Sequence, residues 1–418
     1  MKVAFLLNDL QLSGGVGVVV EHARQLQHRH GFESVLVLAR EQDDPSWSYR
    51  GLTDLRVEAL PSARRESFDV AVATWWETAF SLFELDAARY AYFLQSLEDR
   101  FYKPESPERI GAALTLDLPV DFITEARWIA DTLRRTRPEA RVFYVRNGID
   151  KTAFPLPERV DVRGRRRPLH VLAEGYAQVW FKGVDQAAWA AGAMREPHHL
   201  TLVVPDREEL PEGLAADEIT GPVPREEMSE LYARSDVVLK MSSVEGMFGP
   251  PLEGFHRGAT CVVTPVTGHD EYVEHGWNGL VTEWDDLGGT ARRLDLLAAD
   301  RRFLHFLRTN AVETARGWPS WEQSGQFMAA ALRRIRKLPP PQPSGRRLAA
   351  DVRAAMEMNR YLVVQRNAMA DELAPIWRVK RSRWYIRLRR VRHTRVGRVL
   401  TWPVRRLARG AWRRLREH

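Results

Sequence analysis

Short apolar runs alternate with polar segments along most of the chain, and this alternation is its most regular feature. Each run has strand length, whereas the polar segments carry apolar residues three or four positions apart, as amphipathic helices do. The predicted strands are KVAFLLN, SVLVLA, LRVEAL, DVAVAT, YAYFLQ, DFITEA, VFYVRN, LHVLAEG, HLTLVVP, DVVLKMS, GATCVVTP and NGLVTE. The predicted helices between them include Val19–Leu26, Glu77–Leu85, Glu226–Arg234 and Asp286–Ala298. The sequence therefore predicts an α/β protein with parallel, doubly wound sheets.

One segment rich in glycine, proline and charge interrupts the alternation. This segment, RNGIDKTAFPLPERVDVRGRRRP, follows the seventh predicted strand, so we expect two sheet domains, 1–150 and 151–317. The run WPSWEQSGQFMAAALRRIRKL then predicts one long helix over 318–338. The prolines of PPPQPSG cannot continue that helix, and they open a spacer and tail over 339–418.

Length and composition fit this division. A chain of 418 residues is too long for one core, and 44% apolar residues can fill two. The single cysteine, Cys261, lies in the run ATCVVTP, where we expect a buried strand residue. A lone cysteine allows no disulfide framework, which favours a reducing compartment. The start reads as a strand rather than a signal peptide, and no apolar window is long enough for a membrane span, so we expect a cytoplasmic protein.

The net charge of +7 hides a strong asymmetry between the body and the tail. Residues Arg378–His418 hold 16 Lys/Arg and one acid, a net charge of +15, so the preceding residues carry −8. In this tail, apolar residues recur every three or four positions, with tryptophans nearby and arginines between them. That pattern is typical of a basic amphipathic helix on an anionic membrane surface, here the inner face of the cell membrane. A solvated or partner-bound helix is the alternative. Nucleic acid is not expected, because the body offers no recognition module.

The stretch SSVEGMFGPPLEGFHRG combines two glutamates with glycines and prolines at the end of a predicted strand. Open parallel sheets bind ligands at that end, and a helix that starts at the prolines would direct backbone N–H groups towards a phosphate. Gly246 and Gly249 allow close approach to the backbone. Glu245 and Glu253 cannot bind phosphate, but carboxylates accept hydrogen bonds from hydroxyl groups. A nucleotide sugar, which carries phosphate between two polyhydroxyl groups, fits this pattern; the alternative is that the glutamates only cap the helix.

Two further segments fit a phosphate-containing ligand. Lys182 follows the LHVLAEG strand and precedes a helix, where an ammonium group could neutralise a diphosphate leaving group, although it could also be a surface lysine. Gly14 and Gly15 of SGGVGVVVEHA lie between the first strand and the first helix, where a tight turn or ligand contact would both need glycine. The segment does not match G-x-G-x-x-G because position 20 is valine, which argues against NAD.

Several motifs are absent. The sequence contains no D-x-D triplet that would hold a metal on a diphosphate, and no H-E-x-x-H spacing among its 12 histidines. It also lacks the G-x-x-x-x-G-K-[ST] loop of nucleoside triphosphatases. We therefore expect no metal and no cofactor, with a nucleoside-diphosphate sugar as co-substrate.

The residues that carry these motifs resemble the retaining GT-B glycosyltransferases of glycosyltransferase family 4. The resemblance is most specific from GPVPREEMSELYARSDVVLKMSSVEGMFGPPLEGFHRG to GHDEY and NGLV, with SGGVGVVVEHARQL and VRNGID as further points of likeness. It implies two Rossmann-like domains with a cleft between them, the second binding the donor, and a final helix that packs back on the first. It further implies that Glu253 binds the donor ribose, that Glu245 lies near the reacting carbon, and that Glu271 contacts the ribose or sugar. The remaining groups implied to hold the diphosphate are Lys182 and the loop residues Gly246, Met247, Phe248 and Gly249.

The chain departs from that family pattern at three places. The usual E-G-F-G loop reads E-G-M-F-G here, and the arginine that normally precedes the lysine is missing from AEGYAQVWFKG. A first-domain histidine is replaced in YFLQSLED by Gln95, with Glu98 and Asp99 behind it, and we expect this segment to face the acceptor.

Together these patterns predict a metal-independent, retaining hexosyl- or deoxyhexosyltransferase. It would move a sugar from a nucleoside-diphosphate donor to a hydroxyl group of a glycan or lipid-linked acceptor, in the synthesis of cell-surface polysaccharide or glycoconjugate. Two alternatives stay open: a sugar-nucleotide epimerase of GT-B fold, and a non-catalytic scaffold that binds nucleotide sugars.

Overall fold

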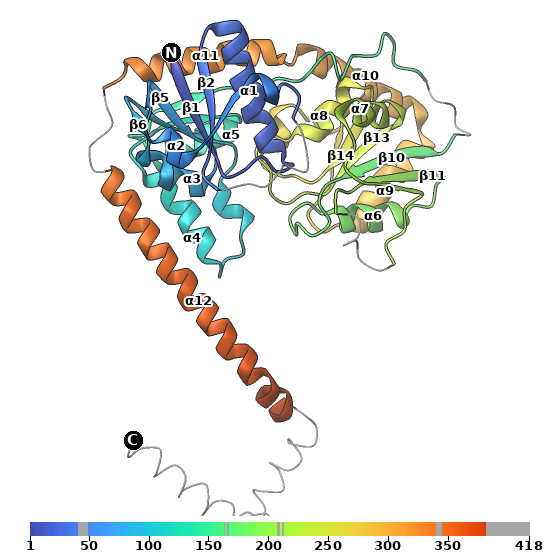
Figure 1. Cartoon of the computed structure of the whole chain (residues 1–418). Helices are drawn as coiled ribbons and strands as arrows, with labels where there is room; N and C mark the ends of the chain where they lie inside the picture. Colours follow the sequence, from blue (N-terminus) through green and yellow to red (C-terminus); the bar gives the residue numbers. More distant parts are fainter. Residues whose placement is uncertain are drawn as a thin grey trace, which may run out of the picture. The chain divides into compact units, whose positions relative to one another are not determined.

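The computed structural model describes residues 1–40, 49–162, 164, 167–206, 210, 213–339 and 345–381. Two compact units occur, Met1–Arg353 and a part that begins at Ala354. The first unit contains two parallel sheets flanked by helices (Figure 1), as the alternating pattern predicts. The predicted α/β class with two Rossmann-like sheets is therefore confirmed.

The first sheet has seven strands in the order β3-β2-β1-β5-β7-β8-β9, and all neighbouring strands are parallel. The order reverses direction beside β1, so the carboxyl ends of β1 and β5 flank a topological switch point, where such sheets bind ligands. The strands are β1 Lys2–Leu7, β2 Glu33–Leu38, β3 Arg56–Ala59, β5 Val70–Ala73, β7 Tyr90–Leu94, β8 Asp121–Thr124 and β9 Val142–Tyr144, with β4 Ser67–Phe68 and β6 Asp86–Ala87 as a separate pair. The helices are α1 Gly14–His30, α2 Leu60–Ala63, α3 Trp76–Ser81, α4 Pro107–Leu114 and α5 Arg127–Thr136. Short 3₁₀ turns occur at η1 Leu52–Asp54, η2 Leu82–Glu84, η3 Glu98–Phe101 and η4 Thr115–Asp117.

The second sheet has six parallel strands in the order β12-β11-β10-β13-β14-β15. Its strands are β10 Leu169–Glu174, β11 His198–Val203, β12 Glu218–Thr220, β13 Val237–Lys240, β14 Thr260–Val263 and β15 Leu280–Val281. Its helices are α6 Val184–Gly192, α7 Arg225–Arg234, α8 Gly249–His256, α9 Leu287–Ala299 and α10 Arg301–Gly317, with the 3₁₀ turn η6 at His269–Glu271. We call β1 to β9 the first sheet domain and β10 to α10 the second sheet domain. Cys261 is fully buried in β14, which confirms the expectation for this residue.

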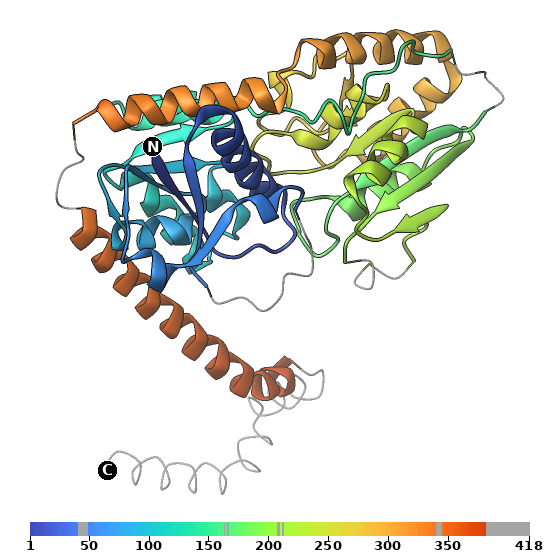
Figure 2. The ribbon, with the colours of Figure 1, turned by 45° about the horizontal axis from the view of Figure 1, so that its top comes forward.

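The last helix before the spacer, α11 (Trp321–Lys337), follows the second sheet domain in sequence but lies against the first (Figure 2). Met328, Ala329, Leu332 and Ile335 join the core formed by β1, β2 and α1. The helix begins three residues later than predicted, because Trp318 is extended and Ser320 caps the first turn together with Gln323. The chain therefore passes between the sheet domains twice. The two connecting segments are hydrogen-bonded to each other, because the Ile149 amide donates to the Pro319 carbonyl at 3.1 Å.

Helix α12 (Gly345–Arg381) follows the spacer. At its start, Arg353 donates a hydrogen bond to Ser81 at 2.8 Å and pairs with Glu84 at 3.1 Å. Of the predicted basic tail, 382–418 lie outside the described residues. No helix within the described ranges is both long and apolar enough to span a membrane.

Candidate active site

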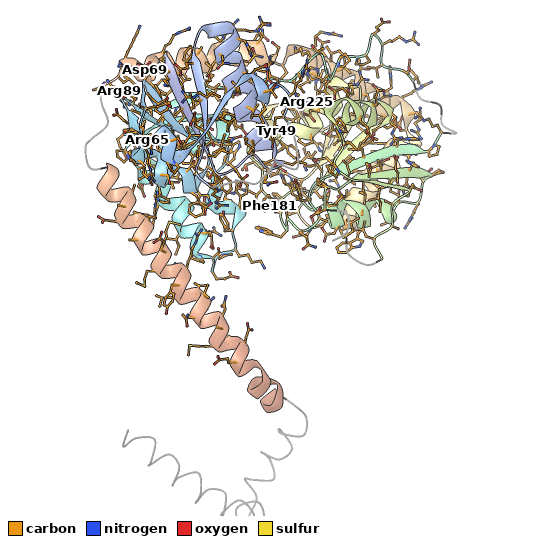
Figure 3. All side chains as sticks on the ribbon, viewed as in Figure 1. Tyr49, Arg65, Asp69, Arg89, Phe181 and Arg225 are labelled. Carbon is orange, nitrogen blue, oxygen red and sulfur yellow. The ribbon has the colours of Figure 1, made fainter. Side chains whose placement is uncertain are left out.

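The predicted site residues all follow carboxyl ends of parallel strands, the edge at which such sheets bind ligands. In the first sheet domain, Gly14 and Gly15 follow β1, and Gln95, Glu98 and Asp99 follow β7. In the second, Lys182 follows β10 and Glu271 follows β14. The remaining residues follow β13: Glu245, Gly246, Met247, Phe248, Gly249 and, within α8, Glu253. Side chains from both sheet domains meet at this edge. Phe181, which is labelled in Figure 3, stacks on Phe101 with ring centroids 5.1 Å apart.

Lys182 and Glu245 form the centre of the candidate site. The Lys182 ammonium group lies 3.0 Å from both carboxylate oxygens of Glu245. Lys182 is positioned by Gly183, the residue that precedes α6, which has a φ of 61°. Gly183 leaves no room for a side chain, because a Cβ there would stand 2.3 Å from the Met241 carbonyl oxygen. The two predicted catalytic residues are therefore in direct contact.

A second lysine, Lys240 at the end of β13, lies beneath this pair. Its side chain is 2% exposed, and its ammonium group contacts the carboxylate of Glu174 and lies 3.9 Å from Glu245. Burial on its own would lower the pKa of Lys240, but the charges of Glu174 and Glu245 raise it above its ordinary value. Burial likewise opposes ionisation of Glu245, yet Lys182 and Lys240 lower the pKa of this carboxyl. Two lysines therefore keep Glu245 ionised at neutral pH.

The loop that follows Glu245 is held by the first sheet domain. Trp128 donates its indole N–H to the Gly246 carbonyl at 3.0 Å, and Ser96 donates to the Glu245 carbonyl at 3.3 Å. The Met247 amide, one of the groups predicted to bind diphosphate, donates to the buried Glu125 carboxyl at 3.1 Å. Burial raises the pKa of Glu125 to about 7.

Gly246 packs tightly against the first sheet domain. A Cβ built at Gly246 would stand 1.8 Å from the Gln95 carbonyl oxygen, whereas one at Gly249 meets nothing within 4 Å. We expect Gly246→Ala to lower the free energy of unfolding by about 1–3 kcal/mol, because backbone must move to admit the methyl group. Urea unfolding of this variant beside Gly249→Ala, the matched control, checks the expectation; equal effects of both substitutions would contradict it.

Glu253 lies on α8, one helical turn from its start, and is half-buried. Burial raises the pKa of Glu253 to about 7, against the charge of Arg225, which lowers it. Arg225 in turn lies 3.3 Å from Asp150. A carboxylate at this position can accept hydrogen bonds from hydroxyl groups. Pro250 and Pro251, at the start of α8, carry no N–H, so the helix offers a ligand fewer amides than an ordinary first turn.

Glu271 contacts the first sheet domain. Its carboxylate accepts hydrogen bonds from two backbone N–H groups at the start of α5, that of Arg127 and, at 3.2 Å, that of Trp128. It also accepts a hydrogen bond from the hydroxyl group of Tyr144 at 3.1 Å. Ala126, the residue that precedes α5, has no side-chain cap of its own. Glu271 therefore stabilises the start of this helix in the structure, and its predicted contact with the donor stays a prediction.

The glycine turn and Gln95 lie together. The Gln95 amide donates to the Gly15 carbonyl at 3.3 Å, and a Cβ at Gly15 would approach that amide to 3.3 Å, whereas Gly14 has open space. Tyr49 holds the preceding turn by accepting the Ser13 amide at 2.8 Å, and it lies near the junction of the two sheet domains in Figure 3. The turn is thus fixed beside the segment predicted to face the acceptor.

Glu98 and Asp99 occupy different surroundings. Glu98 is 3% exposed and accepts the Trp76 backbone N–H at 2.6 Å, so it caps α3 from within the core. Burial raises the pKa of Glu98 to about 8. Asp99 is half-buried, and burial raises its pKa although the charges of Arg109 and Arg100 lower it. Of the two, Asp99 is the one open to solvent.

The raised pKa of Glu98 predicts a pH-dependent stability. Between its ordinary value of 4.5 and about 8, Glu98 is protonated when folded and ionised when unfolded, so its contribution to stability falls as pH rises through this window. In Glu98→Gln the amide oxygen still accepts the Trp76 N–H and this loss disappears. As pH rises, the free energy of unfolding of the variant should therefore increase relative to that of the wild type, by at most about 1.4 kcal/mol per pH unit. Urea unfolding from pH 5 to 8 measures it; parallel curves for both proteins would contradict the expectation.

Three residues of the site were missed from the sequence. Lys240 carries a detectable signal, because a lysine at the end of the apolar run DVVLK is unusual and has to find a carboxylate when it is buried. Glu174 ends the neighbouring strand in the same way. Glu125 follows β8 and gave no signal, since its contact with the Met247 amide depends on how the two sheet domains meet.

Among the residues that the structure describes, no three or more His, Cys, Asp or Glu side chains are grouped so that they could hold a metal ion.

Comparison with known proteins finds a family model that resembles the second sheet domain. Residues 169–300 match the family model described as Glycosyl transferases group 1. No curated protein matches the chain in sequence.

Solved structures match most of the chain in fold. HepE from Anabaena, in a complex with UDP-glucose, is 18% identical with a TM-score of 0.65, and the match covers 80% of this chain and 100% of HepE. Sucrose-phosphate synthase from Thermosynechococcus elongatus is 14% identical with a TM-score of 0.66, over 80% of this chain and 98% of its own. TarM from S. aureus, in a complex with UDP, fondaparinux and α-GlcNAc-glycerol, is 7% identical with a TM-score of 0.61, and the match covers 81% of this chain and 100% of TarM. The fold is therefore GT-B, and the group 1 domain at 169–300 supports a glycosyltransferase.

Proposed function

We propose that the protein is a retaining, metal-independent glycosyltransferase of family 4. It moves a hexosyl or deoxyhexosyl group from a nucleoside-diphosphate donor to a hydroxyl group of a glycan or lipid-linked acceptor, in cell-envelope polysaccharide or glycoconjugate synthesis. The observation that carries the proposal is the part-buried Lys182–Glu245 pair, which lies beside a glycine loop at the carboxyl ends of the strands in a GT-B fold. The complexes of HepE and TarM make UDP-sugars the first donors to test.

The donor would lie along the second sheet domain. Glu253 accepts hydrogen bonds from ribose hydroxyl groups, and Lys182 with amides of 246–249 binds the diphosphate. The bond from the anomeric carbon to the diphosphate breaks, and the acceptor oxygen bonds to that carbon on the same face. The acceptor proton passes to a phosphate oxygen of the departing diphosphate, so no protein nucleophile is needed. Lys182 stabilises the charge on the leaving group, and ionised Glu245 stabilises positive charge at the anomeric carbon.

Product analysis tests this reaction. Nucleotide sugars are mixed with octyl glycosides as acceptors, and nucleoside diphosphate and octyl disaccharide are quantified. Both should form in equal amounts, and the new glycosidic bond should have the anomeric configuration of the donor by proton NMR. An inverted product would contradict the mechanism. Conversion of the donor to another nucleotide sugar without acceptor would instead identify an epimerase.

We further propose that the basic tail, Arg378–His418, holds the enzyme at the inner face of the cell membrane, where lipid-linked acceptors lie. Its net charge of +15 supports this, because each basic residue near an anionic surface contributes about 1 kcal/mol. A chain that ends at Trp377 should lose binding to phosphatidylglycerol vesicles and keep donor binding. Vesicle binding equal to that of the full chain would refute the membrane role.

A further inference from the structure

A basic pocket of about 460 Å³ lies next to the candidate site. Three cations line it from the first sheet domain, Arg100, Lys103 and Arg109, and none of its lining residues is acidic. Trp180 and Val244 line it from the second sheet domain. The pocket thus combines positive charge with an aromatic surface, and it is distinct from the Lys182–Glu245 centre.

The pocket adjoins the segment that carries Glu245. Val244, in its lining, immediately precedes Glu245, whose carbonyl accepts the hydroxyl group of Ser96 at 3.3 Å. Arg100 fixes the pocket across the two sheet domains, because it donates to the Thr267 hydroxyl group at 2.7 Å and its guanidinium lies 5.4 Å from the centre of the Trp128 ring. A molecule held here therefore lies beside the segment that carries Glu245.

Trp180 gives the pocket an aromatic wall. Trp180 is 54% exposed, yet its indole N–H donates to the Phe101 carbonyl at 3.3 Å and its ring meets Phe181 edge-on at 5.5 Å. The residue is thus held in place while more than half of its surface is exposed. An exposed, oriented tryptophan can bury the apolar C–H face of a sugar ring.

Acidic side chains lie near part of the pocket. The charge of Asp99 interacts with those of Arg100 and Arg109, and the charges of Glu77 and Glu108 act on Tyr102 in the lining. Lys103 is exposed at the rim, and within the described part of the chain its ammonium group pairs with no carboxylate. Cations that converge on a cavity of this size bind oxyanions through charge-assisted hydrogen bonds.

We propose that this pocket binds the acceptor, and that the acceptor is a saccharide that carries an oxyanion, a phosphate or a carboxylate. The sugar ring stacks on Trp180, and the oxyanion pairs with Lys103 and Arg109, which leaves a hydroxyl group directed towards Glu245. The assignment rests on the proposed function for its role as acceptor site. The binding of an anionic saccharide at these residues can be tested by itself.

Saturation-transfer NMR in the presence of UDP tests the pocket with methyl glucuronide, glucose 1-phosphate and methyl glucoside as observed probes. Inorganic phosphate, which carries no C–H protons, is added as a competitor, and the loss of probe signal reports its binding. The two acidic sugars should bind more tightly than methyl glucoside by about tenfold or more, and raising NaCl from 20 to 500 mM should weaken them, as expected for charge-assisted binding. Tighter binding of glucose 1-phosphate would indicate that the acceptor carries a phosphate, and tighter binding of methyl glucuronide would indicate a carboxylate. If inorganic phosphate binds as tightly as the two acidic sugars, the sugar ring contributes nothing to binding, and this result would contradict the proposal of a saccharide site.

Variants assign the binding to the pocket. Lys103→Gln and Arg109→Gln should each weaken the acidic sugars by about tenfold, and Trp180→Ala should weaken the sugars more than inorganic phosphate. Arg195→Gln, an exposed arginine of the second sheet domain, is the matched control and should change nothing. Thermal stabilisation by nucleotide sugars should persist in all four variants, which shows that the donor site is intact.

Equal binding of methyl glucoside and the acidic sugars, or binding that all four variants retain, would overturn the proposal. The two failures are distinguishable. If nucleotide sugars bind and acidic sugars do not bind here, this inference is wrong and the proposed function stands. If acidic sugars bind here while no nucleotide sugar stabilises the protein, the pocket stands as an anion site and the transferase assignment fails.

Discussion

Replacing Lys182 with alanine is expected to lower the rate of sugar transfer by about 100- to 1,000-fold. The ammonium group is the nearest cation to Glu245, at 3.0 Å, and it is proposed to stabilise the charge on the departing diphosphate. Removal of one preorganised charge-stabilising group costs about this much in other enzymes. Lys240, 3.9 Å from Glu245 and buried, cannot replace it, because its ammonium group is held by Glu174.

Steady-state transfer kinetics measure the effect, with Lys337→Ala as the control, because Lys337 is exposed at the end of α11. The turnover number should fall in Lys182→Ala, with a smaller change in the KM for the acceptor. Glu245→Ala should have a comparable effect, since it removes the other half of the pair. Full activity in both variants would contradict the assignment of Lys182 and Glu245 as catalytic residues.

The second large effect concerns stability. Lys240→Met is expected to lower the free energy of unfolding by about 3–5 kcal/mol, because it leaves the part-buried Glu174 carboxylate without its cation. Lys240 is 2% exposed and contacts Glu174, which is 22% exposed. In the double variant Lys240→Met with Glu174→Gln the uncompensated charge is removed, so part of the loss should return.

Urea unfolding of the single and double variants at pH 7 supplies this comparison. A methionine that leaves stability within about 1 kcal/mol of the wild type would show that the buried pair is replaceable by packing alone, as some buried ion pairs are. A double variant that is less stable than Lys240→Met would contradict the charge argument, since no unpaired Glu174 carboxylate then remains.

Strands and most helices followed from local pattern. Apolar runs such as KVAFLL and TCVV become fully buried parallel strands, because their apolar side chains fill both faces of a covered sheet. The start of α11 was displaced because the capping residues Ser320 and Gln323, rather than the bulky Trp318, decide where the first turn begins. Helix α10, which follows Asp300, was not expected at all, although Asp300 caps it through the backbone N–H groups of Arg302 and Phe303.

The site was predictable where one segment carries the chemistry. Glu245, Gly246 and Lys182 were recognised from short motifs, and the structure brings them together. Contacts between the two sheet domains were not predictable, since Glu125 meets Met247 and Glu271 meets α5 across more than 100 residues of sequence. The basic pocket was missed for the same reason: Arg100 and Trp180 gain a shared role only when the two domains meet.

Thermal unfolding with a panel of nucleotide sugars tests the central claim most directly. A nucleoside-diphosphate sugar that binds the native state raises the melting temperature. At least one member, with UDP-glucose as the first to try, should stabilise the wild type, and the same compound should lose most of this effect in Lys182→Ala but keep it in Lys337→Ala. A panel in which no nucleotide sugar shifts the wild type, or in which Lys182→Ala responds like the wild type, would contradict the donor site at Lys182 and Glu245.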